Sequence, residues 1–337
     1  MSAARGIRDP RIWLGLALTL VAGWFALRDV DLRAVREEFR RADWRVLLGV
    51  SIPAYLAAVY LRALRWRHLT DAIQPIPRVA LFRAVAVGFM ANNLFPLRMG
   101  EVIRVWYLAR ETGAPVAAVL GTVVLERVID ALCVIGMALG VIHFWGGETG
   151  TWQRGITWLV PLALLPVVML GLLRAAPEQT LGLAARALRP APDRVSTWLL
   201  RELRVFAAGL GALRGGAHWG WVALHSLAIW GVASTLPFLA AFWALDMDFG
   251  GPARTLAAGW MTLAAVGIAV ALPSAPGFFG LYHSACRLVL ERFGASAESS
   301  VAIGTLCHAV FWLTLSTLGV LVLRFRQTRL GDLRRPD

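Results

Sequence analysis

The stretch NNLFPLRMGEVIR (residues 92–104) interrupts a chain that is otherwise mostly apolar. It places Pro96 and Gly100, two residue types that break helices, among several polar and charged side chains. A second stretch, LERVID (residues 125–130), puts three charged side chains in the middle of another apolar run. The fold has to explain why such an apolar chain carries these groups.

The composition is that of a membrane protein. The chain has 337 residues, of which 58% are hydrophobic and 16% charged, whereas a soluble protein is usually about a quarter charged. Apolar runs recur near the ~20 residues needed to cross a bilayer. The candidate membrane segments are 12–27, 46–64, 79–97, 116–145, 156–174, 219–245, 254–272 and 299–323. We expect one integral membrane domain over residues 1–337.

The basic charge does not indicate a nucleic-acid partner. The formal net charge is +13, and every basic residue is arginine. Basic residues of membrane proteins gather in cytoplasmic loops and helix ends, where they set orientation and meet anionic lipid. No basic cluster is interleaved with aromatic residues on a soluble segment, so we expect no nucleic-acid binding.

No metal or cofactor motif is recognised in the sequence. Cys133, Cys286 and Cys307 lie in apolar segments without CxxC spacing, which is typical of packed, unreactive cysteines. The six histidines form no HExxH pattern. A nucleotide-binding motif is also absent, so we expect neither a cofactor nor direct ATP drive.

The distribution of arginine predicts the topology. The connection 174–214 is rich in arginine and has the pattern of amphipathic helices on a membrane surface. If all eight segments crossed from a cytoplasmic N-terminus, this connection would lie outside, against the positive-inside rule. The connection becomes cytoplasmic if residues 79–110 enter the membrane from the cytoplasm and return to the same side. The C-terminus is also cytoplasmic if residues 254–290 enter from the outside and return there.

We therefore predict an all-α polytopic protein with about six transmembrane helices and two oppositely oriented re-entrant hairpins. That layout resembles an inverted repeat, in which broken helices build a site near the midplane. One region fits poorly: residues 28–45 would be external although they contain six arginines. They also hold five acidic residues, and Leu32, Val35 and Phe39 mark an amphipathic interfacial helix.

The first hairpin break is predicted at Asn92, Asn93, Pro96 and Gly100. Backbone that leaves a helix inside a bilayer must be buried in protein or face a wet cavity. Asparagine amides can bond the freed peptide groups, proline stops a helix, and glycine permits close approach.

Charged side chains follow that break. Arg98, Glu101 and Arg104 are spaced i, i+3, i+6 and would share a helix face. The alternative is an interfacial helix whose arginines reach toward water.

The charges of LERVID are the costliest in the chain. Glu126, Arg127 and Asp130 lie deep in the segment 116–145, and each ionisable group at a helix centre costs about 2.5–3.5 kcal/mol on insertion scales. One interpretation is a structural ion pair. The other is that Arg98 or Arg104 pairs with Glu126 or Asp130, which leaves at least one guanidinium to bind an anion.

The second hairpin break is predicted in PGFFGLYHS (residues 276–284), at Pro276, Gly277 and Gly280. A Pro-Gly pair can mark an ordinary turn. As part of a site, the same segment would carry the imidazole of His283 to the hairpin tip.

These motifs resemble a known family. NNLFPLRMGEVIRVWYLAR is similar to the N-x-x-x-P-x-R-x-G-E-x-x-R pattern of the lysylphosphatidylglycerol synthase transmembrane-region family, also called the flippase-like domain family. LERVID resembles its E-R-x-x-D motif and PGFFG its late P-G-x-x-G motif, and the similarity covers roughly residues 10–325. The family often has a glutamate shortly after P-G-x-x-G, where this chain has His283.

The resemblance implies a membrane protein that moves, or helps move, lipids across the bilayer. We expect it in the bacterial inner membrane, and the arginine distribution predicts that both termini are cytoplasmic. We expect a stand-alone member whose partners are lipids with anionic, phosphate-bearing or polyprenyl-linked headgroups. The residues expected to bind substrate are Arg98, Arg104, Arg127, Asn92 and Asn93. Those expected to balance charge or carry protons are Glu101, Glu126, Asp130 and His283.

Two other functions stay open from the residues. Paired acids and arginines in a membrane cleft could serve an enzyme that transfers a group onto a lipid. The charges could instead hold helices together in a non-catalytic membrane scaffold.

Overall fold

The structure is a computed structural model. It describes residues 10–71, 73–96, 98–145, 216–272 and 275–325, together with part of the positions between 161 and 204. Across these residues all regular secondary structure is helical, so the predicted all-α class is confirmed.

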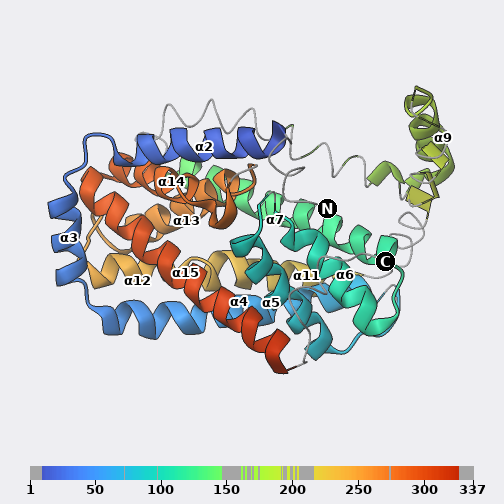
Figure 1. Cartoon of the computed structure of the whole chain (residues 1–337), viewed down its shortest axis with the longest axis horizontal. Helices are drawn as coiled ribbons and strands as arrows, with labels where there is room; N and C mark the ends of the chain where they lie inside the picture. The colour runs from blue at the N-terminus through green and yellow to red at the C-terminus, as the bar shows by residue number, and fades with distance from the viewer. Residues whose placement is uncertain are drawn as a thin grey trace.

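The helices follow one another along the chain as Figure 1 shows. They are α2 (Pro10–Leu27), α3 (Leu32–Arg41), α4 (Trp44–Thr70), α5 (Arg78–Leu94), α6 (Gly100–Thr112), α7 (Val116–Trp145), α9 (Pro177–Ala187), α11 (Gly216–Leu227), the π-helix η2 (Ala228–Ala233), α12 (Leu236–Ala244), α13 (Pro252–Ala269), the short η3 (Pro276–Phe278), α14 (Leu281–Leu290), η4 (Glu291–Phe293) and α15 (Ala297–Phe325).

Three helical stretches are long and apolar enough to cross a membrane, namely Trp44–Thr70, His218–Ala244 and Ala297–Phe325. The second joins α11, η2 and α12 into one run. Helix α7 has 30 residues, about 45 Å at 1.5 Å per residue, but it carries the charges of LERVID. The count of about six spans stays a prediction.

Helix α4 runs antiparallel to the run α11–η2–α12. At one end the Asp43 amide donates to the Ala244 carbonyl at 2.8 Å. At the other end the rings of His68 and His218 lie 5.8 Å apart. We call the first the α3 end of the bundle and the second the α6 end, after the short helices nearby.

Helices α5 and α6 form a hairpin that opens toward the α6 end. Near the open end, Gln74 Nε2 donates to the Thr112 carbonyl at 3.1 Å. Near the tip, the Gly100 amide donates to Asn92 Oδ1 at 2.9 Å. The chain therefore turns back between residues 95 and 99, where the sequence predicts the first break.

The second hairpin consists of α13 and α14, which pack on each other. The rings of Phe249, just before α13, and Phe293, just after α14, lie 6.3 Å apart. Phe249 also contacts Phe242 of α12, with 4.9 Å between ring centroids, which places the open end at the α3 end. The two hairpins thus enter the bundle from opposite ends, while their relation to a bilayer stays a prediction.

Each hairpin packs on a long helix from the other half of the chain. Helix α5 packs against α15, where Gly319 meets Met90 so closely that a Cβ at Gly319 would lie 2.3 Å from the Met90 Cβ. Helix α13 packs against α7, where Gly267 faces Val134. The two halves are therefore interlocked.

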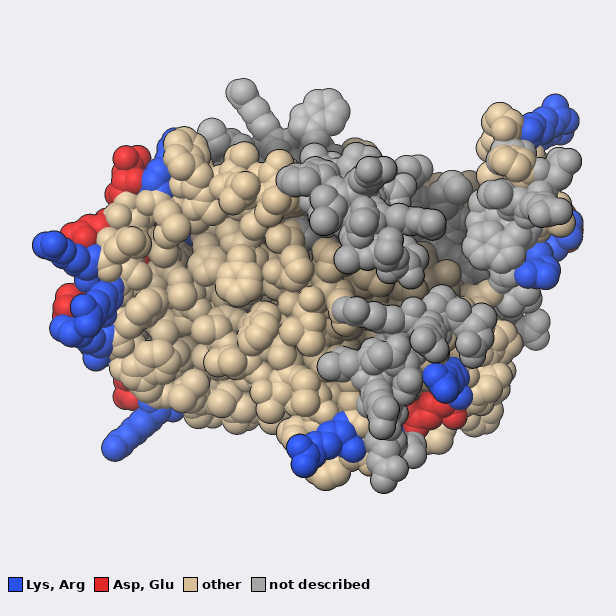
Figure 2. Space-filling view, in the orientation of Figure 1, with Lys and Arg blue, Asp and Glu red and all other residues tan. Residues whose placement is uncertain are grey.

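Charged side chains gather at the ends of the molecule. On the face in Figure 2, the α3 end carries many charges, and a wide region without them lies next to it. The amphipathic helix predicted within 28–45 is α3, which buries Val35 and whose Glu38 accepts from Ser299 Oγ at 2.9 Å. In the connection 174–214, α9 buries Leu181, and much of the remainder lies outside the described residues.

Candidate functional site

The tip of the first hairpin has an unusual backbone. Arg98 has a left-handed conformation with φ of 55°, which is uncommon for a residue with a side chain and is often found at functional sites. Asn92 holds the tip through its bond to the Gly100 amide. Gly100 has no room for a side chain, because an added Cβ would lie 2.0 Å from the Gly88 carbonyl oxygen.

Glu101 links the hairpin to helix α7. Its carboxylate lies 2.9 Å from Arg104 Nη2 and 3.6 Å from Arg98 Nη2. Arg127 Nη1 of α7 approaches the same carboxylate at 3.5 Å. The predicted shared face of Arg98, Glu101 and Arg104 is thus present.

Glu126 is fully buried and meets three arginines. Arg104 Nη1 lies 3.3 Å away, Arg127 Nη2 2.9 Å and Arg65 Nη2 3.2 Å. The contact with Arg104 confirms the expected pairing between the hairpin and LERVID.

Asp130 is held by elements from both halves of the chain. Its oxygens lie 3.2 Å from Arg62 Nη1, 2.7 Å from Arg65 Nη2 and 3.0 Å from Arg127 Nη2. The indole Nε1 of Trp230, on the π-helix η2, donates to Asp130 at 2.8 Å. A π-helix widens the local turn and is frequent at functional sites.

The eight charged side chains form one network, which we call the charge cluster. Its members are Arg62, Arg65, Arg98, Arg104 and Arg127 with Glu101, Glu126 and Asp130. Five cations against three anions leave a formal charge of +2.

Three of the cluster's contacts were not predicted from the sequence. Arg62 and Arg65 lie in the span expected at 46–64 or just beyond it, and Trp230 lies in the span expected at 219–245. The sequence pattern that could have indicated Arg62 and Arg65 is their i, i+3 spacing at the end of an apolar run. Such residues inside a membrane segment usually mark a site.

A cavity of about 670 Å³ adjoins the charge cluster. Its polar wall includes Arg62, Arg98, Glu101, Arg104, Arg127 and Asp130. The rest of the lining is mainly apolar, with side chains of α7 such as Val124 and Val128 and side chains of α13 such as Leu263 and Val266. Val124 is 44% exposed, so this wall reaches the surface of the described structure.

The tip of the second hairpin also lines the cavity. Phe278 and Tyr282 contribute side chains to the lining. Gly277 has φ of 75° and Phe278 of 62°, so the predicted break at Pro276 and Gly277 coincides with left-handed backbone. Gly280 packs on α2, where an added Cβ would lie 2.6 Å from the Thr19 carbonyl oxygen.

His283 and Asn93 lie apart from the charge cluster. The ring of His283 packs near that of His308, with 5.2 Å between centroids, and His308 Nε2 lies 2.6 Å from the Gly277 carbonyl oxygen. Asn93 donates to Ser316 Oγ of α15 at 3.0 Å. The structure therefore gives both residues contacts that join the hairpins to α15.

Comparison with known proteins identifies the family. One curated relative, "Glycosyltransferase AglD" of Haloferax volcanii, is 25% identical over 330 residues, which cover 90% of this chain and 52% of the relative. The chain thus spans about half the length of that protein. No solved structure matches the chain. The family model "Lysylphosphatidylglycerol synthase TM region" matches residues 12–319, and the chain therefore belongs to that family.

Proposed function

We propose that the protein is a flippase- or scramblase-like transporter that moves a lipid with a phosphate-bearing headgroup across the membrane. The observation that supports this most directly is the cavity, which combines a cationic polar wall with an apolar wall. Its volume of about 670 Å³ falls within the usual range for ligand pockets. Such a cavity is suited to an amphiphile.

The charge cluster favours a headgroup with two negative charges. The cluster carries a formal charge of +2, and a bound dianion would balance it. The buried Nε atoms of Arg98, Arg104 and Arg127 have no hydrogen-bond partner within the described residues, and all three side chains line the cavity. A phosphomonoester or a diphosphate would supply the charge and the acceptor oxygens that guanidinium groups bind well.

The apolar wall suits the lipid chain. Helices α7 and α13 contribute valine and leucine side chains, and Phe278 and Tyr282 of the second hairpin contribute aromatic rings. An acyl or polyprenyl chain placed there would remain in a hydrocarbon environment while its phosphate meets the arginines.

Alternating access would come from the two hairpins. They enter the bundle from opposite ends, and both tips line the same cavity. In an inverted repeat, rocking of one half against the other exposes such a site first to one side and then to the other. We propose that both hairpins are re-entrant in the inner membrane. We also propose that Glu101 keeps the charge of the neighbouring arginines balanced while they move.

A second candidate function is group transfer onto a lipid. It is favoured by the name of the relative, a glycosyltransferase. Against it, Glu126 and Asp130 each contact several arginines, which makes them poor proton acceptors.

The test is leaflet exchange in vesicles. The purified protein is reconstituted into phosphatidylcholine liposomes that carry a fluorescent lipid, and dithionite bleaches the outer leaflet. We expect fluorescent phosphatidic acid, a phosphomonoester, to exchange faster than fluorescent phosphatidylglycerol, a monoanionic diester. Arg98→Gln and Arg127→Gln should slow exchange by about tenfold or more, since a hydrogen bond to a charged group contributes about 1.5–3 kcal/mol.

The matched control is Arg110→Gln, because Arg110 lies on α6 like the cluster residue Arg104 but is exposed and stacks on Trp106. It should exchange lipid at the wild-type rate. The proposal fails if folded wild-type protein exchanges no lipid, or if all three variants behave alike. Mass spectrometry of the recovered lipid detects chemical conversion, which would favour the enzyme.

A further inference from the structure

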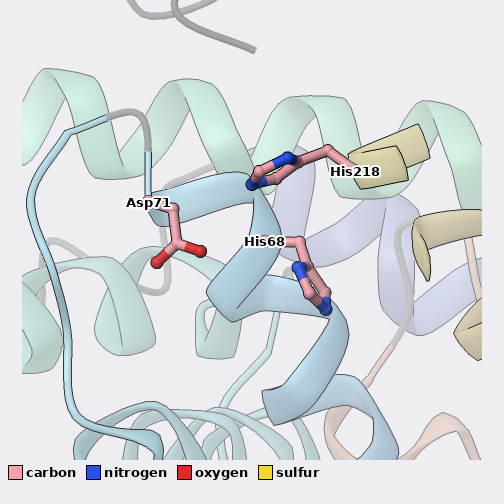
Figure 3. Close-up of side chains that lie close together, drawn as sticks. All are labelled: His68, Asp71 and His218. Atoms are coloured by element: carbon pink, nitrogen blue, oxygen red, sulfur yellow. The ribbon is translucent and has the colours of Figure 1, made fainter. Parts of the chain in front are cut away.

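A second group of chemically active side chains lies away from the cavity, where α4 ends and α11 begins. His68 is in the last turn of α4, Asp71 is its C-cap residue, and His218 is in the first turn of α11. One ligand atom from each of the three lies within 4.8 Å of the other two. Figure 3 shows the two imidazole rings and the carboxylate around a common gap.

These donors suit a transition metal better than calcium or magnesium. Imidazole nitrogen with a carboxylate oxygen is a usual donor set for zinc and its neighbours. Zinc–ligand bonds of about 2.0–2.2 Å in a tetrahedron place ligand atoms roughly 3.3 Å apart. Side chains at the ends of helices can close the remaining distance by small rotations, because His218 is partly exposed and Asp71 exposed.

The surroundings leave the three donors accessible. Arg67 Nε lies 4.0 Å from the Asp71 carboxylate, which is too long for a hydrogen bond. The indole of Trp221 lies parallel to the ring of His68, with centroids 6.3 Å apart and an interplanar angle of 4°. His225 is nearby, but its Nδ1 lies 2.7 Å from the Trp221 carbonyl oxygen.

We propose that His68, Asp71 and His218 bind a divalent transition-metal ion, with zinc as the ion of choice. Three protein ligands leave a fourth position for water. The ion would connect α4 to α11 at the α6 end of the bundle. Helix α4 carries Arg62 and Arg65, and α11 continues into η2 with Trp230, so the metal would brace two elements that hold Asp130.

The experiment uses tag-free, full-length protein in detergent. After zinc loading and dialysis, we expect about one zinc per chain by elemental analysis. Binding of cobalt should give the intense visible bands of a four-coordinate nitrogen–oxygen site, without a thiolate charge-transfer band from Cys133, Cys286 or Cys307. His68→Gln, Asp71→Asn and His218→Gln should each weaken zinc binding by at least about tenfold.

His283→Gln is the matched control, because it removes a histidine that packs on another histidine, His308, away from the proposed ligands. It should bind zinc like the wild type. The proposal is overturned if wild-type protein retains no zinc, if cobalt gives only weak six-coordinate or thiolate bands, or if folded ligand variants bind zinc unchanged. The cobalt spectrum of the wild type tests the proposed ligand set even if a variant does not fold.

Discussion

Arg62 and Arg65 change the interpretation of LERVID. From the sequence alone, Glu126 and Asp130 have Arg127 beside them and two arginines of the hairpin as candidate partners. In the structure, helix α4 brings two further guanidinium groups to Asp130. No residue spacing along the chain indicates that contact, because it depends on how two separate helices pack.

Arg65 and Arg127 contact the same carboxylates but differ in burial, with side chains 0% and 35% exposed. We expect Arg65→Gln to destabilise the protein by about 1–3 kcal/mol, because it removes a charged donor from two buried carboxylates that other arginines of the cluster still contact. Arg127→Gln should cost less, because its side chain is partly exposed. Thermal unfolding of both variants in the same detergent measures the difference, and equal losses of stability would contradict this view of the charge cluster.

At the scale of elements, helix breakers proved more informative than helix length. Pro96 with Gly100, and Pro276 with Gly277, coincide with the turns of the two hairpins. The π-helix η2 was not predicted, because LAIWGVAST contains no proline and reads as an ordinary apolar helix. Its wide turn is set by tertiary contacts, among them the bond from Trp260 Nε1 to the Gly231 carbonyl at 3.1 Å.

The close approach of α5 and α6 depends on Gly100. We expect Gly100→Ala to destabilise the protein by about 1–3 kcal/mol or more, because an added Cβ would meet the Gly88 carbonyl and Asn92. Gly136→Ala on α7 is the control, since no atom lies within 4 Å of its added Cβ, and it should stabilise by about 0.5–1 kcal/mol. Unfolding midpoints report both changes, and a neutral Gly100→Ala would contradict the tight hairpin.

For the whole molecule, charge bias predicts two hairpins that enter a membrane from opposite faces. The described structure places the open ends of the two hairpins at opposite ends of the bundle, and their insertion into a bilayer stays a prediction. The site could be predicted only in part. The motifs located the hairpin arginines and LERVID, whereas the cavity wall combines residues that are distant in sequence.

The same arginine distribution predicts the orientation in the membrane. We expect the α6 end to face the cytoplasm and the α3 end to face outward. In a cysteine-free background, Arg45→Cys at the α3 end should react with an impermeant maleimide added to intact cells, and Arg78→Cys at the α6 end only after lysis. Both positions are exposed, so labelling depends on which side of the membrane the reagent can reach. The reverse labelling pattern would show that the protein has the opposite orientation.

The two halves of the chain contribute differently to the cavity. All eight members of the charge cluster come from residues 62–130, whereas Trp230, Leu263, Phe278 and Phe311 of the later half complete the wall. During synthesis these ionic groups can therefore pair with one another before the ribosome has made the second half. In the proposed transporter, substitutions in that half can therefore change the apolar wall without altering the arginines proposed to bind phosphate.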